Sequence, residues 1–242
     1  MNEELKPNPA APAGAQNSIQ NENIRLRGDL LTIARRITHD LRTPLGGIIT
    51  TGEVMKEILK AEQPSAVPLM ASIFDSADSI DKLLERVSFV LKASANPPSL
   101  QRLKMEEAVF RARQRLEYKT LQKGFTVSEP KDWPEVNGVA AWLEVVWWNF
   151  LINGLNHGKS RIELGWRMEN GEIQFWVFDD GDGVPEKKRP KLFQPFHLMH
   201  EHDAGRGLGL SIVQRLVELQ GGRCGYGPRP DGAWCFYFTL PA

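Results

Sequence analysis

The stretch Ile37-Thr-His-Asp-Leu-Arg-Thr-Pro-Leu45 lies inside a run of apolar residues, spaced by three and four, from about residue 22 to 61. This spacing predicts one long amphipathic helix. A second run with the same spacing extends from Met70 to Leu91, after a break that contains Pro64 and Pro68. Together the two runs predict an antiparallel helical hairpin, joined by a short proline-containing loop.

Apolar surface left over on both helices favours a homodimer, because two hairpins can bury it in a dimeric four-helix bundle. The alternative is a hairpin that packs on the rest of its own chain. The sustained heptad spacing of the second run favours the dimer.

Three segments are expected along the chain. Residues 1–21 are rich in Pro, Ala, Asn and Gln and cannot offset their ordering entropy by burial, so they are expected to be a disordered lead-in. The hairpin then occupies residues 22–95. Asn96-Pro-Pro98 ends the second helix and opens a second domain over residues 96–242.

Helix and strand patterns are mixed in the second domain. Helices are expected at about residues 105–116, 138–157 and 208–219, and strands at 125–128, 162–168, 173–178 and 234–240. This order fits a two-layer α/β sandwich, a mixed sheet with helices on one face. The fold class is therefore α+β.

Composition excludes several classes of protein. The 242 residues carry a formal net charge of zero, so no overall field attracts nucleic acid or an anionic membrane. The longest apolar run, residues 145–152, is far short of a membrane span, and no signal-peptide pattern opens the chain. Cys224 and Cys235 have no metal-like spacing and are expected to be buried, reduced thiols on neighbouring strands. We therefore expect a cytoplasmic location.

His39 lies two residues from Ile37 and from Leu41, so its side chain should project away from the apolar stripe of the helix. An imidazole there can attack a phosphoryl group, with Asp40 accepting a proton or a hydrogen bond from the ring. Thr43, one turn further on the same face, can position a water or a carboxylate for the reverse reaction. The alternative is a solvent-facing histidine with an accidental acidic neighbour.

Two further clusters suit a nucleotide. Asn149 and Asn153 lie four apart on one helix face, where amides can hold Mg²⁺ and contact phosphate; the alternative is a pair of surface or capping asparagines. Asp179 follows an apolar strand, where a carboxylate can accept a hydrogen bond from the adenine amino group. Gly181 and Gly183 would let the backbone approach the ring, although acidic glycine turns are common.

A glycine-rich segment, Gly205-Arg-Gly-Leu-Gly-Leu210, leads into the last expected helix. The backbone amides of Gly205, Gly207 and Gly209 precede a helix N-terminus and so can bind phosphate. Arg206 either adds a charge to the phosphates or is a solvated loop arginine. The spacing does not fit a dinucleotide-binding Rossmann fold.

The polar segment between residues 185 and 205 suggests a mobile lid. Zinc held by His197, His200 and His202 is a further hypothesis, weakened because no cysteine or fourth ligand is close in the sequence. The basic run Lys187-Lys-Arg189 is most simply a solvated surface.

Taken in order, these segments resemble the core of the sensor histidine kinases of two-component systems. The likeness is carried by His39–Leu45 as the H box, Asn149–Asn153 as the N box, Asp179–Gly183 and Gly205–Leu210 as the glycine boxes, and Leu192–Phe196 as the F box. It implies a dimerisation and histidine-phosphotransfer hairpin followed by a Bergerat-type ATP-binding domain, with ATP and Mg²⁺ as cofactors.

The same resemblance implies roles for single residues of the hairpin. His39 would accept the phosphoryl group, with Asp40 as its acid–base partner, and pass it to an aspartate on a response-regulator receiver domain. Thr43 matches a position linked in this family to phosphatase activity toward that regulator. The signal would reach the kinase through the N-terminal helix extension or a separate sensor protein.

In the second domain the resemblance implies that Asn153 holds Mg²⁺, with Asn149 beside the phosphates, and that Asp179 binds adenine. The glycines of the second glycine box would cover the phosphates. Gly154 and Asn156 depart from the family pattern, which often has Ala and Lys there, so a phosphate-facing charge is missing.

We therefore expect an ATP-dependent protein-histidine kinase. One rival is a non-catalytic histidine phosphotransfer or adaptor protein with a degenerate ATP site. Another is a clamp-like ATPase of the same superfamily, which would not need a nucleophilic histidine.

Overall fold

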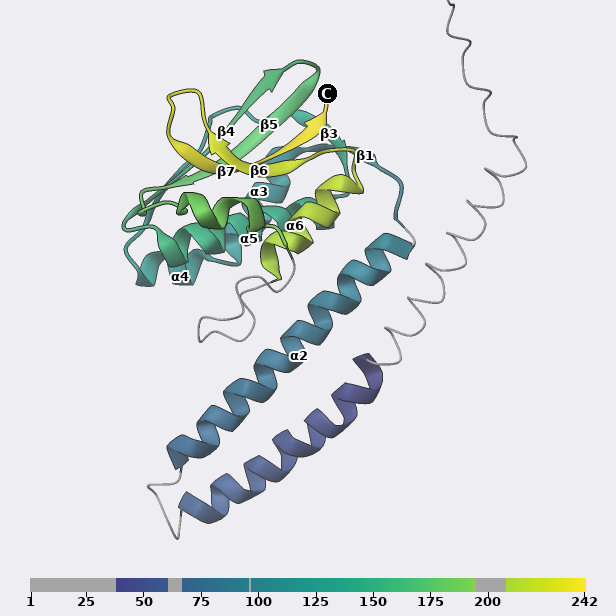
Figure 1. The fold of residues 1–242 in the computed structure, drawn as a ribbon, viewed down its shortest axis with the longest axis vertical. Helices are drawn as coiled ribbons and strands as arrows, with labels where there is room; N and C mark the ends of the chain where they lie inside the picture. Colours follow the sequence, from purple (N-terminus) through teal and green to yellow (C-terminus); the bar gives the residue numbers. More distant parts are fainter. Residues whose placement is uncertain (1–37, 61–66, 96, 195–207) are drawn as a thin grey trace, which may run out of the picture.

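The computed structural model describes residues 38–60, 67–95, 97–194 and 208–242 (Figure 1). The expected lead-in over residues 1–21, the start of the first helix and the hairpin connection lie outside these ranges. The described part consists of two helices followed by a domain with a mixed sheet and helices, and the predicted α+β class is confirmed.

The hairpin pairs a helix over residues 38–60 with α2, Val67–Ala95. Figure 1 shows the two helices lying antiparallel. Arg42 Nε donates a hydrogen bond of 2.8 Å to Asp81 Oδ1, and Lys56 Nζ lies 5.7 Å from the centre of the Phe74 ring. Because residues later in the first helix meet residues earlier in the second, these contacts fix the antiparallel register.

Much of the apolar stripe of the hairpin is open to solvent in a single chain. Leu45 and Ala77 are buried. The exposed members of the stripe are Leu41, Ile48, Met55, Ile73 and Ile80. The expectation of apolar surface left over on both helices is therefore confirmed for this part of the hairpin.

The last turns of α2 pack on the second domain of the same chain. Ala93 belongs to the core of that domain, and Val87, Phe89 and Val90 pack against it. Arg215 Nε donates a hydrogen bond of 3.0 Å to Ser94 Oγ. The alternative of packing on its own chain therefore holds for the end of the hairpin, whereas its exposed apolar residues leave the dimer as a prediction.

The second domain contains a mixed five-stranded sheet in the order β2-β4-β5-β7-β6. Only the β2–β4 pair is parallel. The strands are β2, Thr126–Ser128; β4, Arg161–Glu169; β5, Glu172–Asp179; β6, Cys224–Pro228; and β7, Trp234–Pro241. A separate antiparallel pair consists of β1, Gln101–Lys104, and β3, Glu135–Gly138.

The α-helices of the domain lie together on one face of the sheet (Figure 1). They are α3, Met105–Gln114; α4, Glu117–Gln122; α5, Ala140–His157; and α6, Gly209–Glu218. A 3₁₀ helix, η2, covers Glu186–Lys191. The predicted two-layer arrangement, a mixed sheet with helices on one face, is confirmed.

Aromatic rings join the two layers. Trp147 of α5 is fully buried and meets Phe238 of β7 edge to face, with ring centres 5.4 Å apart. Phe175 of β5 stacks on Phe238 at 5.0 Å. The indole N–H of Trp147 points at the sulfur of Met105 in α3, with 3.1 Å between Nε1 and Sδ. This packing fixes α5 between the sheet and α3, and α5 carries both candidate asparagines.

The start of α5 differs from the sequence prediction. Gly138 belongs to β3, and the helix begins at Ala140. Val139 N donates a hydrogen bond of 2.9 Å to the side chain of Gln220, a buried residue just beyond α6. This contact lies 81 positions away along the chain, so no local pattern could reveal it.

The two cysteines are free; Cys224 lies on β6 and Cys235 on β7, and these two strands are paired. Burial raises the pKa of the Cys224 and Cys235 thiols to about 12. The predicted free thiols on neighbouring strands are confirmed, and Cys235 is buried as expected, whereas Cys224 is only half-buried. None of the helices in the described ranges is both long and apolar enough to cross a membrane.

Candidate nucleotide site and phosphoacceptor

His39 stands on the outer surface of the hairpin, with its side chain 81% exposed. Its Nδ1 lies 3.3 Å from Asp40 Oδ1. The hydroxyl of Thr43 donates a hydrogen bond of 3.4 Å to the His39 carbonyl oxygen, one turn earlier. The helix places the three side chains as the sequence predicts, with an accessible imidazole beside a carboxylate.

Asn149 is a buried residue of α5, only 6% exposed. Its Nδ2 donates a hydrogen bond of 2.7 Å to the Val145 carbonyl oxygen. Its Oδ1 lies 2.6 Å from the position that a Cβ on Gly209 would take. Because Gly209 opens α6, the fold brings the N box against the end of the second glycine box. The alternative of a surface asparagine is therefore wrong for Asn149.

Asn153 follows one turn later on α5 and is half-buried. The next turns of this helix approach Asp179, at the end of β5. The Cβ of Asp179 lies 3.7 Å and 3.2 Å from the positions that a Cβ would take on Gly154 and Gly158. Small residues there let the helix approach the strand end closely, and this brings the asparagine face and the carboxylate to one region.

Asp179 is a partly buried carboxylate. Burial raises the pKa of Asp179 above its ordinary value, although a hydrogen bond from the Gly181 backbone N–H and the nearby His157 act in the opposite direction. The Gly181 N–H donates to Asp179 Oδ1 over 3.1 Å. A Cβ at residue 181 would overlap the His157 carbonyl oxygen, so glycine is needed for this close approach.

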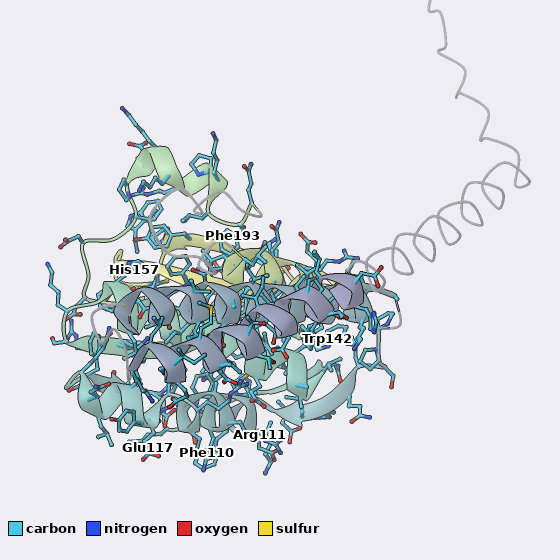
Figure 2. All side chains as sticks on the ribbon, turned by 90° about the horizontal axis from the view of Figure 1, so that it is seen from below. Phe110, Arg111, Glu117, Trp142, His157 and Phe193 are labelled. Atoms are coloured by element: carbon cyan, nitrogen blue, oxygen red, sulfur yellow. The ribbon has the colours of Figure 1, made fainter. Side chains whose placement is uncertain are left out.

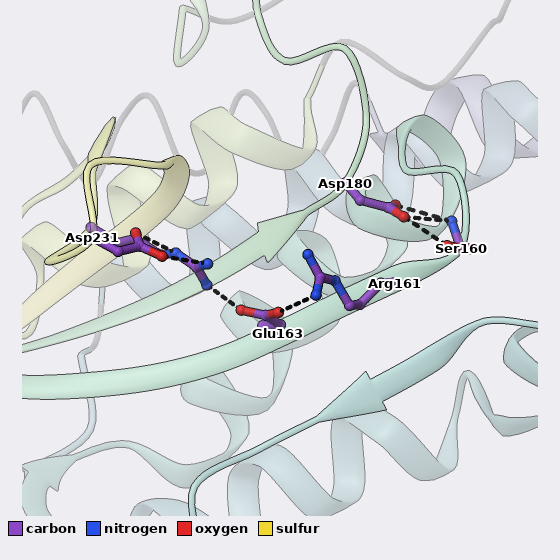
Figure 3. Close-up of polar contacts among 6 residues, drawn as sticks. Ser160, Arg161, Glu163, Asp180 and Asp231 are labelled. Carbon is purple, nitrogen blue, oxygen red and sulfur yellow. Dashed lines mark hydrogen bonds and ion pairs between the residues drawn. The ribbon is translucent and has the colours of Figure 1, made fainter.

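The neighbouring acids anchor the turn. Asp180 accepts hydrogen bonds from the backbone N–H and the hydroxyl of Ser160, at 2.7 to 3.2 Å (Figure 3). It also accepts one of 2.8 Å from the backbone N–H of Lys159. These bonds hold the pKa of Asp180 well below its usual range. Asp182 forms an ion pair of 2.6 Å with Lys159. The turn after β5 is therefore tied to the loop after α5, which leaves Asp179 as the acid turned inward.

His157 is an exposed residue that joins the candidate site and that the sequence reasoning missed. It ends α5, four residues after Asn153, and lies close enough to Asp179 to lower the pKa of that carboxyl. In Figure 2 His157 and Phe193 lie toward the side of the domain from which η2 projects, whereas Phe110 and Glu117 lie at the opposite edge. The i, i+4 spacing from Asn153 was the available signal.

The F box is anchored where the structure describes it. Leu192 is 6% exposed, and the Phe193 ring centre lies 6.5 Å from that of Phe236 on β7. Pro195 and Phe196 of this box, the three histidines of the zinc hypothesis, and Gly205, Arg206 and Gly207 lie outside the described residues. Within the ranges that are described, no group of three or more His, Cys, Asp or Glu side chains could hold a metal ion.

Two basic side chains have partners that the sequence did not suggest. Arg189 was expected to be a solvated residue, but its guanidinium lies 3.8 Å over the Trp234 ring. Lys119 of α4 donates a hydrogen bond of 2.9 Å to Asn156 Oδ1. Sensor histidine kinases often have a lysine at the position of Asn156. Here Lys119, from α4, brings a positive charge to that position.

A cavity of about 560 Å³ lies elsewhere, between α3, α4, β2 and α5. Phe110, Leu116, Leu151 and Ile162 line it, and none of the candidate nucleotide residues does. The candidate nucleotide residues instead come together from α5, the end of β5 and the start of α6.

The family model of the histidine kinase-, DNA gyrase B- and HSP90-like ATPases matches residues 138–242. This range contains every candidate nucleotide residue. It begins at the end of β3 and so includes α5, the sheet strands β4 to β7 and α6.

The chain is similar to curated sensor kinases along most of its length. The methanogenesis regulatory histidine kinase FilI of Methanothrix harundinacea is 29% identical over 212 residues, 85% of this chain and 24% of that protein. The sensor protein KdpD of Mycobacterium tuberculosis is 30% identical over 96% of this chain and 28% of its own length. The sensor histidine kinase CpxA of Escherichia coli is 27% identical over 98% of this chain and 54% of its own. The chain thus spans only a part of each of these relatives.

Solved structures share the fold. Full-length ShkA in complex with AMPPNP matches with a TM-score of 0.65 and 25% identity, over 87% of this chain and 45% of that one. The catalytic domain of the histidine kinase ThkA matches with a TM-score of 0.51 and 21% identity, over 60% of this chain. Residues 138–242 therefore form an ATPase domain of the matched family, and the chain is similar along most of its length to two-component sensor histidine kinases.

Proposed function

We propose that the chain is an ATP-dependent protein-histidine kinase that phosphorylates His39 and passes the phosphoryl group to an aspartate of a response regulator. The observation that carries this proposal is an imidazole with 81% of its side chain exposed beside Asp40, in a chain that also holds an ATP-binding domain. A clamp ATPase has no use for such a histidine.

The local geometry supports attack by Nε2. When the proton sits on Nδ1 and is donated to Asp40, the lone pair of Nε2 is free and faces solvent. A bond then forms between Nε2 and the γ-phosphorus of ATP while the bond from that phosphorus to the bridging oxygen breaks, and ADP leaves. In the second step the phosphoryl group moves to the carboxylate of the regulator, and His39 is regenerated.

The nucleotide would be held by the residues that the fold brings together. Asp179 would accept the adenine amino group, and Asn149 would lie beside the phosphates at the start of α6. Mg²⁺ fits the donor set, because Asn153 offers a neutral amide oxygen and Mg²⁺ takes most of its other ligands from phosphate and water. Bound there, the ion would neutralise phosphate charge, and we assign Asn153 to hold it.

A homodimer is the proposed assembly, because the exposed apolar residues of the hairpin can be buried in a four-helix bundle with a second copy. Light scattering that gave the mass of a monomer would overturn this assembly. The response regulator would approach the exposed His39 surface. Thr43, on that same surface, is assigned to the phosphatase reaction toward the regulator.

The kinase reaction is tested by incubating the protein with γ-labelled ATP and Mg²⁺. We expect label on the chain that is lost in acid and stable in base, as a phosphoramidate is. ATP binding without any label would indicate a protein biased toward the phosphatase reaction or lacking its signal. A chain that binds no ATP would instead be the adaptor with a degenerate site.

Gly209→Ala tests the contact between the two boxes. The added Cβ would lie 2.6 Å from Asn149 Oδ1, so one of them must shift. We expect ATP affinity to fall by about tenfold, the equivalent of about 1.4 kcal/mol. Isothermal titration calorimetry with ATP checks this.

Gly47→Ala is the matched control, because a Cβ on Gly47 of the hairpin would meet no atom within 4 Å. Its ATP affinity should equal that of the unchanged protein. Equal affinity in the Gly209→Ala variant would show that the close approach of α6 to Asn149 does not matter for the nucleotide.

A further inference from the structure

Both backbone polar groups of Val184 are held by side chains from other parts of the domain. Its N–H donates a hydrogen bond of 3.2 Å to the Tyr226 hydroxyl, from β6. Its carbonyl oxygen accepts a hydrogen bond of 2.9 Å from Arg189 Nε, in η2. Val184 directly follows Gly183, which has a φ of 71° and ends the first glycine box. The box therefore ends at a residue that is fixed from two sides.

The two side chains that hold Val184 are themselves held by aromatic rings. The Arg189 guanidinium lies 3.8 Å over the Trp234 ring and 5.8 Å from the Tyr226 ring. Tyr226 contacts Trp234 and Phe236, with ring centres 5.4 Å and 4.9 Å apart. The β6–β7 hairpin thus forms an aromatic platform, Tyr226, Trp234 and Phe236, on which Arg189 is stacked.

This platform completes the support of the turn that carries Asp179. At the start of the turn, Asp180 is bonded to Ser160 in the loop after α5. At its end, Val184 is bonded to Tyr226 and Arg189. Between these two anchors lie Gly181, Gly183 and the exposed Asp182, which pairs with Lys159. The glycines have little conformational preference of their own, so the anchors help to decide where the turn lies.

We propose that Arg189 and Tyr226 are positioning residues for adenine recognition, which fix the turn after Asp179 through the backbone of Val184. This role rests on the proposed function, since it assumes that Asp179 meets the adenine amino group. Neither side chain needs to touch the nucleotide. Guanine carries an oxygen in place of that amino group, so a well-placed carboxylate favours ATP over GTP. A protein in which this turn is no longer held in place should therefore bind ATP with a smaller preference over GTP.

The variants Tyr226→Phe and Arg189→Met test the proposal. The first removes only the hydroxyl and keeps the ring contacts, and the second removes the donor and the charge but keeps an apolar side chain. Calorimetric titrations with ATP and with GTP should show ATP affinity reduced about fivefold, the loss expected for one hydrogen bond, with GTP affinity unchanged. Arg189→Lys, which keeps a cation over Trp234, should recover part of the preference for ATP.

Amide hydrogen exchange on the nucleotide-free protein gives a second readout. Exchange over residues 179–185 should be faster in both variants than in the unchanged protein. Arg223→Met is the matched control, because Arg223 pairs with Glu172 at the opposite end of β5 from Asp179. It should change neither this exchange nor the ratio of ATP to GTP affinity.

Two results would overturn the proposal. Unchanged exchange over residues 179–185 would show that the two side chains do not hold the turn. An equal loss of ATP and GTP affinity would show a general structural effect in place of adenine recognition. A protein that binds no nucleotide at all would overturn the proposed function with it, whereas the exchange result would still decide separately whether Arg189 and Tyr226 hold the turn.

Discussion

The His39→Gln variant is expected to take up no acid-labile label from γ-labelled ATP, while it binds ATP as tightly as the unchanged chain. Gln has no ring nitrogen that can form a phosphoramidate, so the acceptor itself is lost. The substitution should be tolerated by the fold because the His39 side chain is 81% exposed. Labelling followed by acid and base treatment measures the first effect, and calorimetry with ATP measures the second.

ATP binding by the variant serves as the control for its folding. Label that persists at the same level in His39→Gln would place the acceptor at another residue and overturn the assignment. Loss of both label and ATP binding would instead show that the substitution had disturbed the domain, which the exposed position of His39 argues against.

Asp179→Asn should weaken ATP binding by about 10- to 100-fold, because hydrogen bonds to charged groups contribute about 1.5–3 kcal/mol. The amide keeps the size of the side chain but lacks the negative charge that accepts the adenine amino group. Label on His39 should fall accordingly at low ATP concentration. Titration calorimetry with ATP measures the affinity directly.

Asp182→Asn is the matched control for this substitution. Asp182 lies in the same turn, but its side chain is 88% exposed and pairs with Lys159. Its ATP affinity should stay within about twofold of the unchanged protein, since surface ion pairs contribute little. An equal loss in the two variants would show that charge in the turn, and not the position of Asp179, governs binding.

Although Asp179→Asn should weaken ATP binding, it should stabilise the nucleotide-free protein, because burial raises the pKa of Asp179. A carboxyl whose pKa is higher in the folded than in the unfolded state lowers stability once it ionises, so its cost grows as the pH rises through the folded-state pKa. At neutral pH the nucleotide-free Asp179→Asn variant should therefore have a higher Tm than the unchanged protein. A lower Tm would contradict the assignment of Asp179 as a carboxylate buried for its function.

Acid should weaken ATP binding for the same reason. As the pH falls through the raised pKa of Asp179, the carboxyl gains a proton and becomes a poorer acceptor. The loss should begin at a higher pH than an ordinary aspartate would give, and it should be absent from the Asp179→Asn variant.

The sequence gives the elements of the site with good accuracy where the pattern is local. The spacing of apolar residues locates the long helix that carries Asn149 and the strand before Asp179, and the structure contains both with slightly different ends. The exposure of His39 follows from its offset from the apolar stripe. These features are local because a helix face or a strand face is fixed by neighbours a few residues away.

Short strands escaped prediction. β1, β3 and β6 have few buried side chains, and β6 contains two glycines and a proline, which disfavour strands. They form because a partner strand supplies their hydrogen bonds, as β7 does for β6. Arg189 was predicted to be solvated for a similar reason: its contact with the Trp234 ring joins two different elements and is not visible in the local sequence.

By itself, then, the sequence determined the exposed histidine with its acidic neighbour, the helix with two asparagines on one face, and the carboxylate at a strand end. Only the tertiary structure decided that Asn149 is buried against Gly209, that His157 lies near Asp179, and that Val184 is bonded from β6 and η2. The physical reason is the distance along the chain over which each kind of interaction acts. Backbone periodicity acts over one or two turns, whereas the contacts of Asn149 with Gly209, His157 with Asp179 and Val184 with Tyr226 join residues far apart in the chain, which packing of the layers brings together.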